Sequence, residues 1–174
     1  MSALVQRLRG LRLMAFDVDG ILTDGHLIYT DTGAEAKAFD VRDGQGMTLL
    51  RDAGIKLALI SARRSAIVER RARELGVHYC FLGVAAKLPA FMDLLAELQL
   101  DATAAGYMGD DLLDLPVLTH AGFAASVSAA PAAVRSRVHY IATRPGGAGA
   151  VREVCELILQ SQGRLDELVA GYLE

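Results

Sequence analysis

Residues 11–25 read LRLMAFDVDGILTDG, an apolar run that changes abruptly into acidic residues and glycines. The apolar part, residues 11–18, has the length and composition of a buried β-strand. In an extended strand, residues two apart point to the same side, so Asp17 and Asp19 both face the region beyond the carboxyl end of the strand. In open α/β sheets that region is where ligands bind. The stretch therefore predicts the first strand of a parallel sheet with a functional site at its end, rather than an acidic turn that only caps a helix.

The rest of the chain alternates short apolar runs with longer segments of helical periodicity. Runs rich in Val, Ile, Leu and Phe predict strands at residues 11–18, 55–60, 78–82, 104–108, 122–125 and 139–142. Helical patterns occupy roughly residues 46–52, 65–75, 88–98, 111–119 and 150–171. This alternation is typical of a parallel sheet with helices on its faces. We therefore predict an α/β, Rossmann-like fold.

Residues 25–39 interrupt the alternation. The runs HLIYT and AKAF flank the turn residues Asp31, Thr32 and Gly33, which is the pattern of a β-hairpin inserted after the first strand. The length of 174 residues corresponds to one domain, so we expect residues 1–174 to form a single unit. Its last part is a C-terminal helix and tail at about residues 150–174.

The composition argues against several classes of function. Hydrophobic residues make up 52% of the chain and charged residues 22%, which is typical of a folded globular protein. A net charge of −3 gives no broad basic surface for nucleic acid, and no run of about 18 apolar residues predicts a membrane span. The N-terminal segment is interrupted by arginines and lacks the features of a secretory signal, so a cytoplasmic location is expected.

A second acidic segment, GDDLLD at residues 109–114, follows the predicted strand at 104–108. Because the carboxyl ends of parallel strands meet at one edge of a sheet, these acids are expected close to Asp17 and Asp19. Carboxylate oxygens are the ligands that Mg²⁺ prefers in proteins, so the edge predicts a magnesium site. For Asp114 two interpretations stay open, since it also suits the first turn of a helix as a cap.

Two further polar residues follow strands or begin helices. Ser61 comes directly after the apolar run IKLALI, and Lys87 begins the helix after HYCFLGVAA. A hydroxyl and an ammonium at adjacent strand ends suit the binding of phosphoryl oxygens and offset their charge. Taken singly, Ser61 is better explained as a helix cap and Lys87 as a solvated surface residue.

Taken in chain order, the four segments resemble the motifs of the haloacid dehalogenase superfamily of phosphotransferases. These segments are DVDG at residues 17–20, Ser61, Lys87 and GDDLLD at residues 109–114. The resemblance implies that Asp17 attacks phosphorus and forms an aspartyl-phosphate. It also implies that Asp19 protonates the leaving alcohol and then activates the hydrolytic water.

The same resemblance implies a ligand set for the metal. Mg²⁺ would be held by the carboxylates of Asp17 and Asp110 and by the backbone carbonyl of Asp19. Ser61 and Lys87 would grip the phosphoryl oxygens. Asp111 and Asp114 would be supporting acids.

Many members of this superfamily carry a cap domain between two of the motifs. Here the segment between Asp19 and Ser61 holds only the predicted hairpin and one helix, and that between Lys87 and Asp110 holds one helix and one strand. We therefore expect no cap domain. A site open to water must then act on a macromolecule, or be covered by another subunit if its substrate is small, and we favour coverage by another subunit.

Longer strings resemble one family within the superfamily, the 3-deoxy-D-manno-octulosonate 8-phosphate phosphatases of lipopolysaccharide synthesis. These strings are FDVDGILTDG, FDVRDGQGM, GYMGDDLLDLPVL and GGAGAVREVCELILQSQG. The resemblance implies a phosphoric monoester hydrolase that releases phosphate from an eight-carbon sugar acid. It also implies a Mg²⁺-dependent homotetramer in which a neighbouring subunit helps to close each cleft.

The resemblance further implies a set of substrate contacts. These residues are Asp19, Asp40, Val41, Arg42, Asp43, Gly44, Arg63, Arg71 and Lys87. A guanidinium suits the bidentate binding of a sugar acid's carboxylate, although composition alone favours a solvated helix face for these arginines. The position of Arg63 next to Ser61 favours a functional role, and for Arg71 both interpretations stay open. The chain departs from the family at Ala62, where Gly is usual, and at Thr48, where Lys or Arg is common. The second departure removes a cation that bears on sugar specificity.

Two other functions fit part of the pattern. A phosphatase of a nine-carbon, sialic-type acid 9-phosphate would use the same motifs and the same oligomer. A receiver-type phosphoacceptor domain also places acids, a hydroxyl and a lysine at strand ends, but its phosphoacceptor stands roughly where Ser61 does and it needs no D-x-D pair. Multiple turnover of a phosphate ester separates the receiver from both phosphatases.

Overall fold

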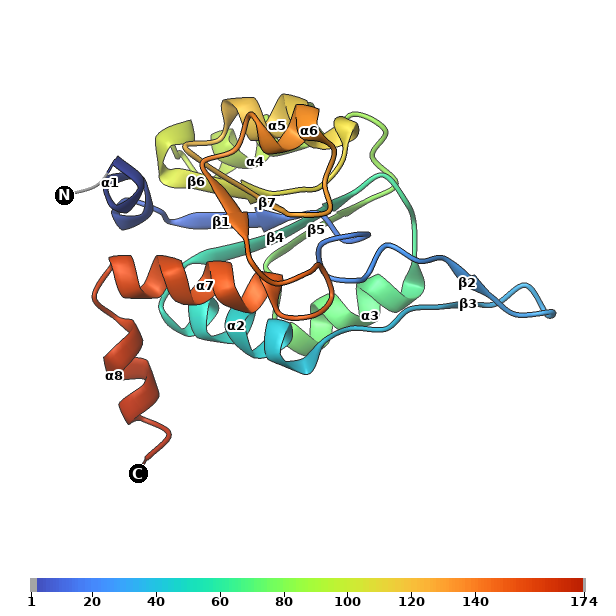
Figure 1. The fold of residues 1–174 in the computed structure, drawn as a ribbon, viewed down its shortest axis with the longest axis horizontal. Coiled ribbons are helices and arrows are strands. Elements are labelled where there is room, and N and C mark those ends of the chain that lie inside the picture. Colours follow the sequence, from blue (N-terminus) through green and yellow to red (C-terminus); the bar gives the residue numbers. More distant parts are fainter. Residues whose placement is uncertain (1–2, 174) are drawn as a thin grey trace.

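The first strand, β1 (Leu13–Phe16), lies in the middle of a six-stranded parallel sheet in the computed structural model, which describes residues 3–173 (Figure 1). It pairs with β4 (Lys56–Ser61) on one side and with β6 (Ala105–Met108) on the other. The outer strands are β5 (Tyr79–Leu82), β7 (Phe123–Val127) and β8 (Tyr140–Ala142), in the order β5-β4-β1-β6-β7-β8. The predicted Rossmann-like fold is therefore confirmed.

The helices form a layer on each face of the sheet (Figure 1). One layer holds α2 (Val41–Asp52), α3 (Ala66–Leu75) and α7 (Ala150–Ser161). The other holds α4 (Lys87–Glu97), α5 (Leu115–His120) and α6 (Ala132–Arg135). The remaining elements are α1 (Ala3–Arg9), α8 (Leu165–Ala170) and two short 3₁₀ helices, η1 (Ala102–Ala104) and η2 (Leu112–Asp114). None of the helices in residues 3–173 has the length and apolar composition needed to cross a bilayer.

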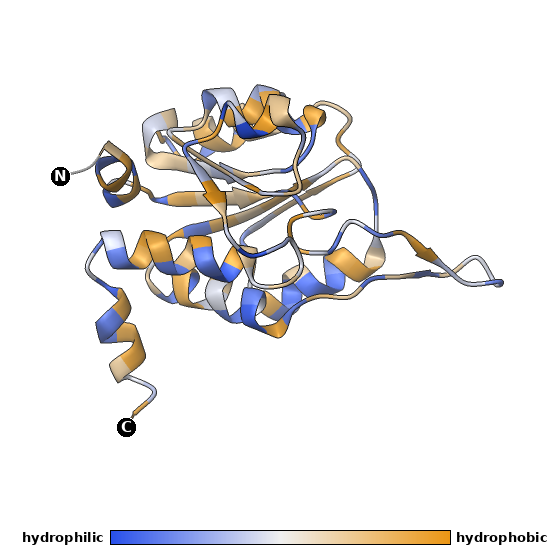
Figure 2. Ribbon diagram, viewed as in Figure 1, coloured by the Kyte–Doolittle hydropathy of each residue, from blue (hydrophilic) through white to orange (hydrophobic). Residues whose placement is uncertain are grey.

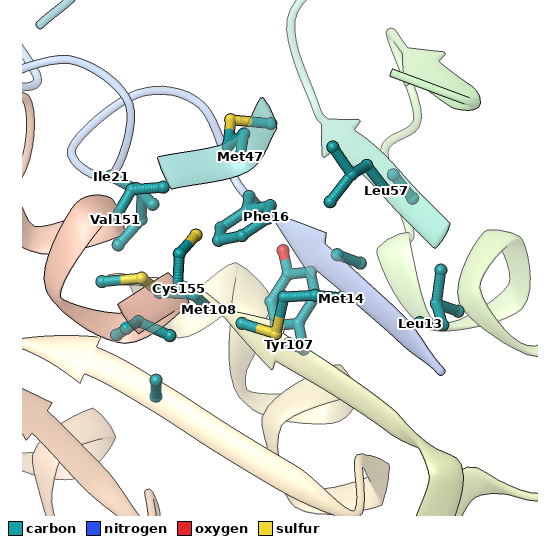
Figure 3. Close-up of a cluster of buried hydrophobic side chains, with 14 of the residues drawn as sticks. Leu13, Met14, Phe16, Ile21, Met47, Leu57, Tyr107, Met108, Val151 and Cys155 are labelled. Atoms are coloured by element: carbon teal, nitrogen blue, oxygen red, sulfur yellow. The ribbon is translucent and has the colours of Figure 1, made fainter. Parts of the chain in front are cut away.

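The core lies between the sheet and its two helical layers. All four residues of β1 are fully buried, as expected for a central parallel strand covered on both faces. Phe16 and Tyr107 are among the largest buried side chains; Figure 3 shows Phe16 near Met47 of α2, whereas Tyr107 packs edge-on against Phe91 of α4. Apolar residues of α2 and α7 are buried, and Figure 2 shows hydrophobic and hydrophilic residues alternating along both helices; in α2 the charged residue Asp43 is buried as well. This packing fixes the end of β1, and with it the acids that follow.

Three predicted helices differ from the observed ones. The helix expected at 46–52 begins five residues earlier, because Asp40 caps it. Gly44 and Gly46 disfavour a helix in the sequence, but both lie inside α2, where close packing requires their small size. A Cβ on Gly46 would lie 3.0 Å from the Cα of Arg152 in α7. The helix expected at 150–171 is broken, since Gly163 adopts a φ of +70° and separates α7 from α8. The segment 111–119 is a 3₁₀ turn followed by the short helix α5.

The predicted hairpin is confirmed. Strands β2 (Ile28–Tyr29) and β3 (Glu35–Ala36) pair in antiparallel register and form an arm that projects beyond the carboxyl ends of the six-stranded sheet (Figure 1). Leu27, Ile28 and Tyr29 are exposed on this arm. No cap domain is present among residues 3–173, as expected.

Candidate active site

The acids of the first and last motifs meet in a pocket at the carboxyl ends of β1, β4 and β6. We call it the acidic pocket; its volume is about 300 Å³. It is lined by Asp17, Asp19, Gly25, Ser61, Ala62, Arg63, Lys87, Asp110, Asp111, Leu113 and Asp114. The pocket thus collects every residue that the sequence assigned to catalysis, to the metal or to acidic support. It sits where the strand order reverses, between β1 and β6, which is the usual ligand position in such sheets.

Lys87 joins the two acidic motifs. Its side chain is 3% exposed, and Nζ lies 2.7 Å from Asp17 Oδ1 and 2.7 Å from Asp114 Oδ1. Burial lowers the pKa of Lys87, but the two carboxylates more than offset this and raise it overall. Lys87 therefore stays charged, and the interpretation of it as a solvated surface residue is wrong.

Asp114 is completely buried and accepts four hydrogen bonds. Lys87 Nζ and the Tyr107 hydroxyl donate to Oδ1 at 2.7 and 2.6 Å, and the backbone N–H groups of Asp110 and Asp111 donate to Oδ2 at 3.0 Å each. Asp114 also forms a capping box with Asp111 at η2. It both caps this turn and ties Lys87 to the loop that carries Asp110. The sequence did not predict Tyr107, which reads as an ordinary strand residue.

The pocket is electrostatically suited to a divalent cation. Oxygens of Asp17, Asp110 and Asp114 all lie within 4.8 Å of one another, and the buried Asp110 Oδ1 has no hydrogen-bond partner. Burial, and secondly the charge of Asp114, raise the pKa of Asp17 to about 6. Burial, and secondly the charge of Asp17, raise the pKa of Asp110 to about 7. Such repelling carboxylates and hard oxygen donors fit Mg²⁺, which would offset their charge.

These raised pKa values predict how the stability of the metal-free protein depends on pH. A carboxyl whose pKa is higher in the folded state binds its proton more tightly there. Its contribution to the free energy of unfolding is therefore full below about pH 4 and is lost as the pH rises to about 7. We expect the free energy of unfolding in a chelator to fall by on the order of 1 to 2 kcal/mol over this range. Urea titrations of the chain and of Asp110→Asn measure it. If the free energy of unfolding of Asp110→Asn fell equally steeply with pH, the raised pKa of Asp110 would not be its cause.

Gly20 and Thr23 shape the loop after β1. Gly20 adopts a φ of +92°, and a Cβ there would lie 2.1 Å from Asp110 Oδ2. The buried Thr23 hydroxyl accepts from the backbone N–H groups of Gly20 and Gly25, at 3.4 and 3.2 Å. The loop at 145–149 packs on this turn, since a Cβ on Gly146 would lie 1.8 Å from the Gly20 carbonyl oxygen. Gly20 is thus a residue that lets the two acidic motifs approach each other.

Replacing Gly20 by Ala is expected to displace Asp110. The added Cβ collides with the carboxylate, and the left-handed backbone is strained for Ala. We expect activity at saturating substrate to fall by about 10²-fold, with a weaker affinity for Mg²⁺. Turnover against Mg²⁺ concentration measures both effects. Gly33→Ala is the matched control, because Gly33 also has a positive φ but no atom lies within 4 Å of its Cβ position. An unchanged Mg²⁺ dependence in Gly20→Ala would contradict the expected displacement.

Ser61 is buried at the end of β4, within the acidic pocket. Its Oγ accepts from the backbone N–H of Arg63 at 3.2 Å, so the hydroxyl's own proton is available to a ligand. It does not cap α3, whose N-cap residue is Ser65.

Asp19 lies at the rim of the acidic pocket and contacts two cations. Lys37 Nζ donates to Oδ1, and Arg63 Nε lies 3.8 Å from Oδ2. Glu35 of the hairpin lies 3.3 Å from Arg63 Nη2 and 3.4 Å from Lys37 Nζ. Lys37 and Glu35 were not predicted as site residues, because only the folding of the hairpin brings them to the pocket.

The remaining predicted substrate contacts lie outside the acidic pocket of their own chain. Asp40 caps α2 and pairs with Arg42 at 2.6 Å, and Val41 is exposed. Asp43 is buried and accepts from the backbone N–H groups of Gly149 and Arg152 at 3.1 and 2.8 Å, which joins α2 to the start of α7.

Gly44 and Arg71 also lie away from the pocket. A Cβ on Gly44 would lie 2.3 Å from Arg71 Nη2, and the Arg71 guanidinium stacks over Phe39. Thr48, at the position of a common family cation, donates to the Gly44 carbonyl at 3.1 Å within α2. Within one chain, these residues stabilise the start of α2.

A larger groove, of about 450 Å³, lies between β8 and α7. Its glutamate Glu153 accepts from the Tyr140 hydroxyl, from the Thr143 hydroxyl and backbone N–H, and from the backbone N–H of Arg144, at 2.7 to 3.0 Å. Both of its oxygens are occupied, and the groove has no cluster of free acids. The acidic pocket is therefore the better candidate active site.

Comparisons with known proteins identify the family. No protein-family model matches the chain. The 3-deoxy-D-manno-octulosonate 8-phosphate phosphatase of Yersinia pestis is 41% identical over 162 residues, which cover 93% of this chain and 87% of that protein.

Solved structures agree with this relationship. A Moraxella catarrhalis phosphatase of the same name, in complex with a magnesium ion, a phosphate ion and KDO, is 45% identical with a TM-score of 0.97 over 99% of both chains. A cobalt-bound phosphatase from Haemophilus influenzae is 39% identical with a TM-score of 0.92, over 97% of this chain and all of the other. The chain belongs to the 3-deoxy-D-manno-octulosonate 8-phosphate phosphatases, a family of the haloacid dehalogenase superfamily.

Proposed function

We propose that this chain hydrolyses 3-deoxy-D-manno-octulosonate 8-phosphate to the free sugar acid and phosphate, with Mg²⁺ as cofactor, in lipopolysaccharide biosynthesis. The observation that carries the proposal is the acidic pocket, in which Asp17 and Asp110 face each other beside the ammonium of Lys87. Support comes from the Moraxella relative, which binds magnesium, phosphate and KDO on the same fold.

In the first step, a carboxylate oxygen of Asp17 forms a bond to phosphorus while the bond from phosphorus to the sugar oxygen breaks. Asp19 gives its proton to that oxygen, so the sugar leaves as an alcohol. In the second step, water bonds to phosphorus, its proton passes to Asp19, and the bond from phosphorus to Asp17 breaks. Two displacements replace one difficult hydrolysis, and Asp19 returns to its starting state.

The other residues of the pocket bind and orient the phosphoryl group. The Ser61 hydroxyl and the Lys87 ammonium donate to its oxygens, and Asp114 holds Lys87 in place. The carboxylates of Asp17 and Asp110 and the backbone carbonyl of Asp19 would hold Mg²⁺. When bound there, Mg²⁺ offsets the negative charge of the phosphoryl group.

The substrate contacts assigned by resemblance complete the proposal. Arg63 lies at the pocket rim with its side chain 42% exposed, so its guanidinium is accessible to the carboxylate of a sugar acid. Residues 40–44 and Arg71 lie outside the pocket, so we propose that they contact substrate where subunits meet. The chain is then one domain in a cytoplasmic homotetramer, in which a neighbouring subunit covers the open cleft.

A phosphate-release assay tests this function. With Mg²⁺, we expect multiple turnover of 3-deoxy-D-manno-octulosonate 8-phosphate and a higher kcat/KM for it than for a nine-carbon, sialic-type acid 9-phosphate. A preference for the nine-carbon substrate would reverse the assignment of the substrate. One phosphoryl group transferred per chain without turnover would instead support a receiver-type phosphoacceptor.

A further inference from the structure

The hairpin that follows β1 has two different faces. Tyr29 and Glu35 are directly opposite each other in the strand pair and therefore share one face, while Ile28 and Ala36 share the other. The first face meets the rim of the acidic pocket. Tyr29 accepts from Arg63 Nη2 at 3.1 Å, and Glu35 accepts from the Ser65 hydroxyl at 2.9 Å. The hairpin is thus attached to the pocket by polar side chains.

Lys37 follows Glu35 on the same polar face. Its side chain is only 1% exposed, and its Nζ contacts Asp19 Oδ1 and lies 3.4 Å from Glu35 Oε1. A buried ammonium is costly unless it is paired, and here two carboxylates pair with it. Lys37 is therefore fixed in one place, and its contact restricts the carboxyl group of Asp19.

The other oxygen of Asp19 faces a different cation. Arg63 Nε lies 3.8 Å from Asp19 Oδ2, and the Arg63 guanidinium is itself held by Glu35. Glu35 thus links Lys37 and Arg63, one on each side of Asp19. Of the two cations, Lys37 has the closer contact and the smaller exposed fraction.

We propose that Lys37 is a positioning residue that holds the carboxyl group of Asp19 in the orientation needed for proton transfer. The inference rests on the proposed role of Asp19 as proton donor and acceptor. A positioned proton donor matters for an alkyl phosphate, whose alkoxide leaves poorly, but hardly for p-nitrophenyl phosphate, whose phenolate leaves without a proton.

The test compares kcat/KM for three substrates in Lys37→Met. These are 3-deoxy-D-manno-octulosonate 8-phosphate, glycerol 3-phosphate and p-nitrophenyl phosphate. We expect a loss of about 10²-fold for both alkyl phosphates and of less than about 3-fold for p-nitrophenyl phosphate. Lys37→Arg should recover part of the loss, and Lys56→Met, on the exposed start of β4, is the matched control. If circular dichroism shows that Lys37→Met is unfolded, Lys37→Gln takes its place.

Two outcomes for Lys37→Met would overturn the inference. An equal loss on all three substrates would indicate a general structural effect. A loss confined to the sugar acid phosphate would make Lys37 a carboxylate-binding residue.

A double-mutant cycle separates this inference from the proposed function. If Lys37 acts through Asp19, adding Lys37→Met to Asp19→Asn should cause no further loss on alkyl phosphates. If Asp19→Asn shows no dependence on the leaving group, the proposed role of Asp19 fails and the inference fails with it. If Asp19→Asn shows that dependence and Lys37→Met does not, only the inference fails.

Discussion

Asp17→Asn is expected to abolish turnover, with a loss of about 10⁴-fold or more in kcat. The amide keeps the shape of the side chain but lacks the anionic oxygen that bonds to phosphorus in the proposed first step. Phosphate release from 3-deoxy-D-manno-octulosonate 8-phosphate at saturating Mg²⁺ measures the effect.

The same variant should remain folded. Lys87 still pairs with Asp114 at 2.7 Å, and the substitution removes a buried carboxylate that repels its neighbours. We therefore expect a free energy of unfolding at pH 7, in chelator, no lower than that of the unaltered chain. The control Asp93→Asn changes an exposed aspartate of α4 and should keep full activity. Residual turnover above about 1% in Asp17→Asn would exclude Asp17 as the nucleophile.

Removal of Mg²⁺ by a chelator should also abolish activity, again by about 10⁴-fold or more. Without the cation, the carboxylates of Asp17 and Asp110 oppose an incoming phosphoryl group that carries the same charge. Excess Mg²⁺ should restore full activity, because the apolar core does not depend on the metal.

A binding measurement makes this prediction independent of turnover. Calorimetric titration with Mg²⁺ should show one site in the unaltered chain and a strongly weakened site in Asp110→Asn. Asp93→Asn should bind like the unaltered chain. Full activity in the presence of chelator, or unaltered Mg²⁺ binding by Asp110→Asn, would contradict the metal assignment.

The acidic pocket could largely be predicted from local sequence. Asp17 and Asp110 each follow a short apolar strand, and the parallel sheet brings the ends of neighbouring strands together whatever the details of the loops. Lys87 and Ser61 follow by the same reasoning. What the sequence alone left open was the part played by Asp114, which depends on a buried hydroxyl of Tyr107 and on two backbone N–H groups.

Contacts between distant segments could not be predicted in this way. Lys37 and Glu35 reach Asp19 only because the hairpin folds back on the pocket rim, and no local pattern marks that contact. Asp43 accepts from the backbone N–H of Gly149 across 106 residues of chain, and no local pattern marks that contact either. The break after α7 was missed because a single glycine, Gly163, is compatible with a continuing helical pattern.

The covalent intermediate on Asp17 is tested most directly by trapping it. The unaltered enzyme and Asp19→Asn are mixed with substrate and Mg²⁺, quenched in acid within the first turnover, and analysed by peptide mass spectrometry. We expect one added phosphoryl group on the peptide that contains Asp17. With p-nitrophenyl phosphate as substrate, whose phenolate leaves without a proton, we expect more of it in Asp19→Asn because hydrolysis of the intermediate lacks its base. Phosphate release within that turnover, with no phosphoryl group on this peptide in either protein, would contradict the mechanism.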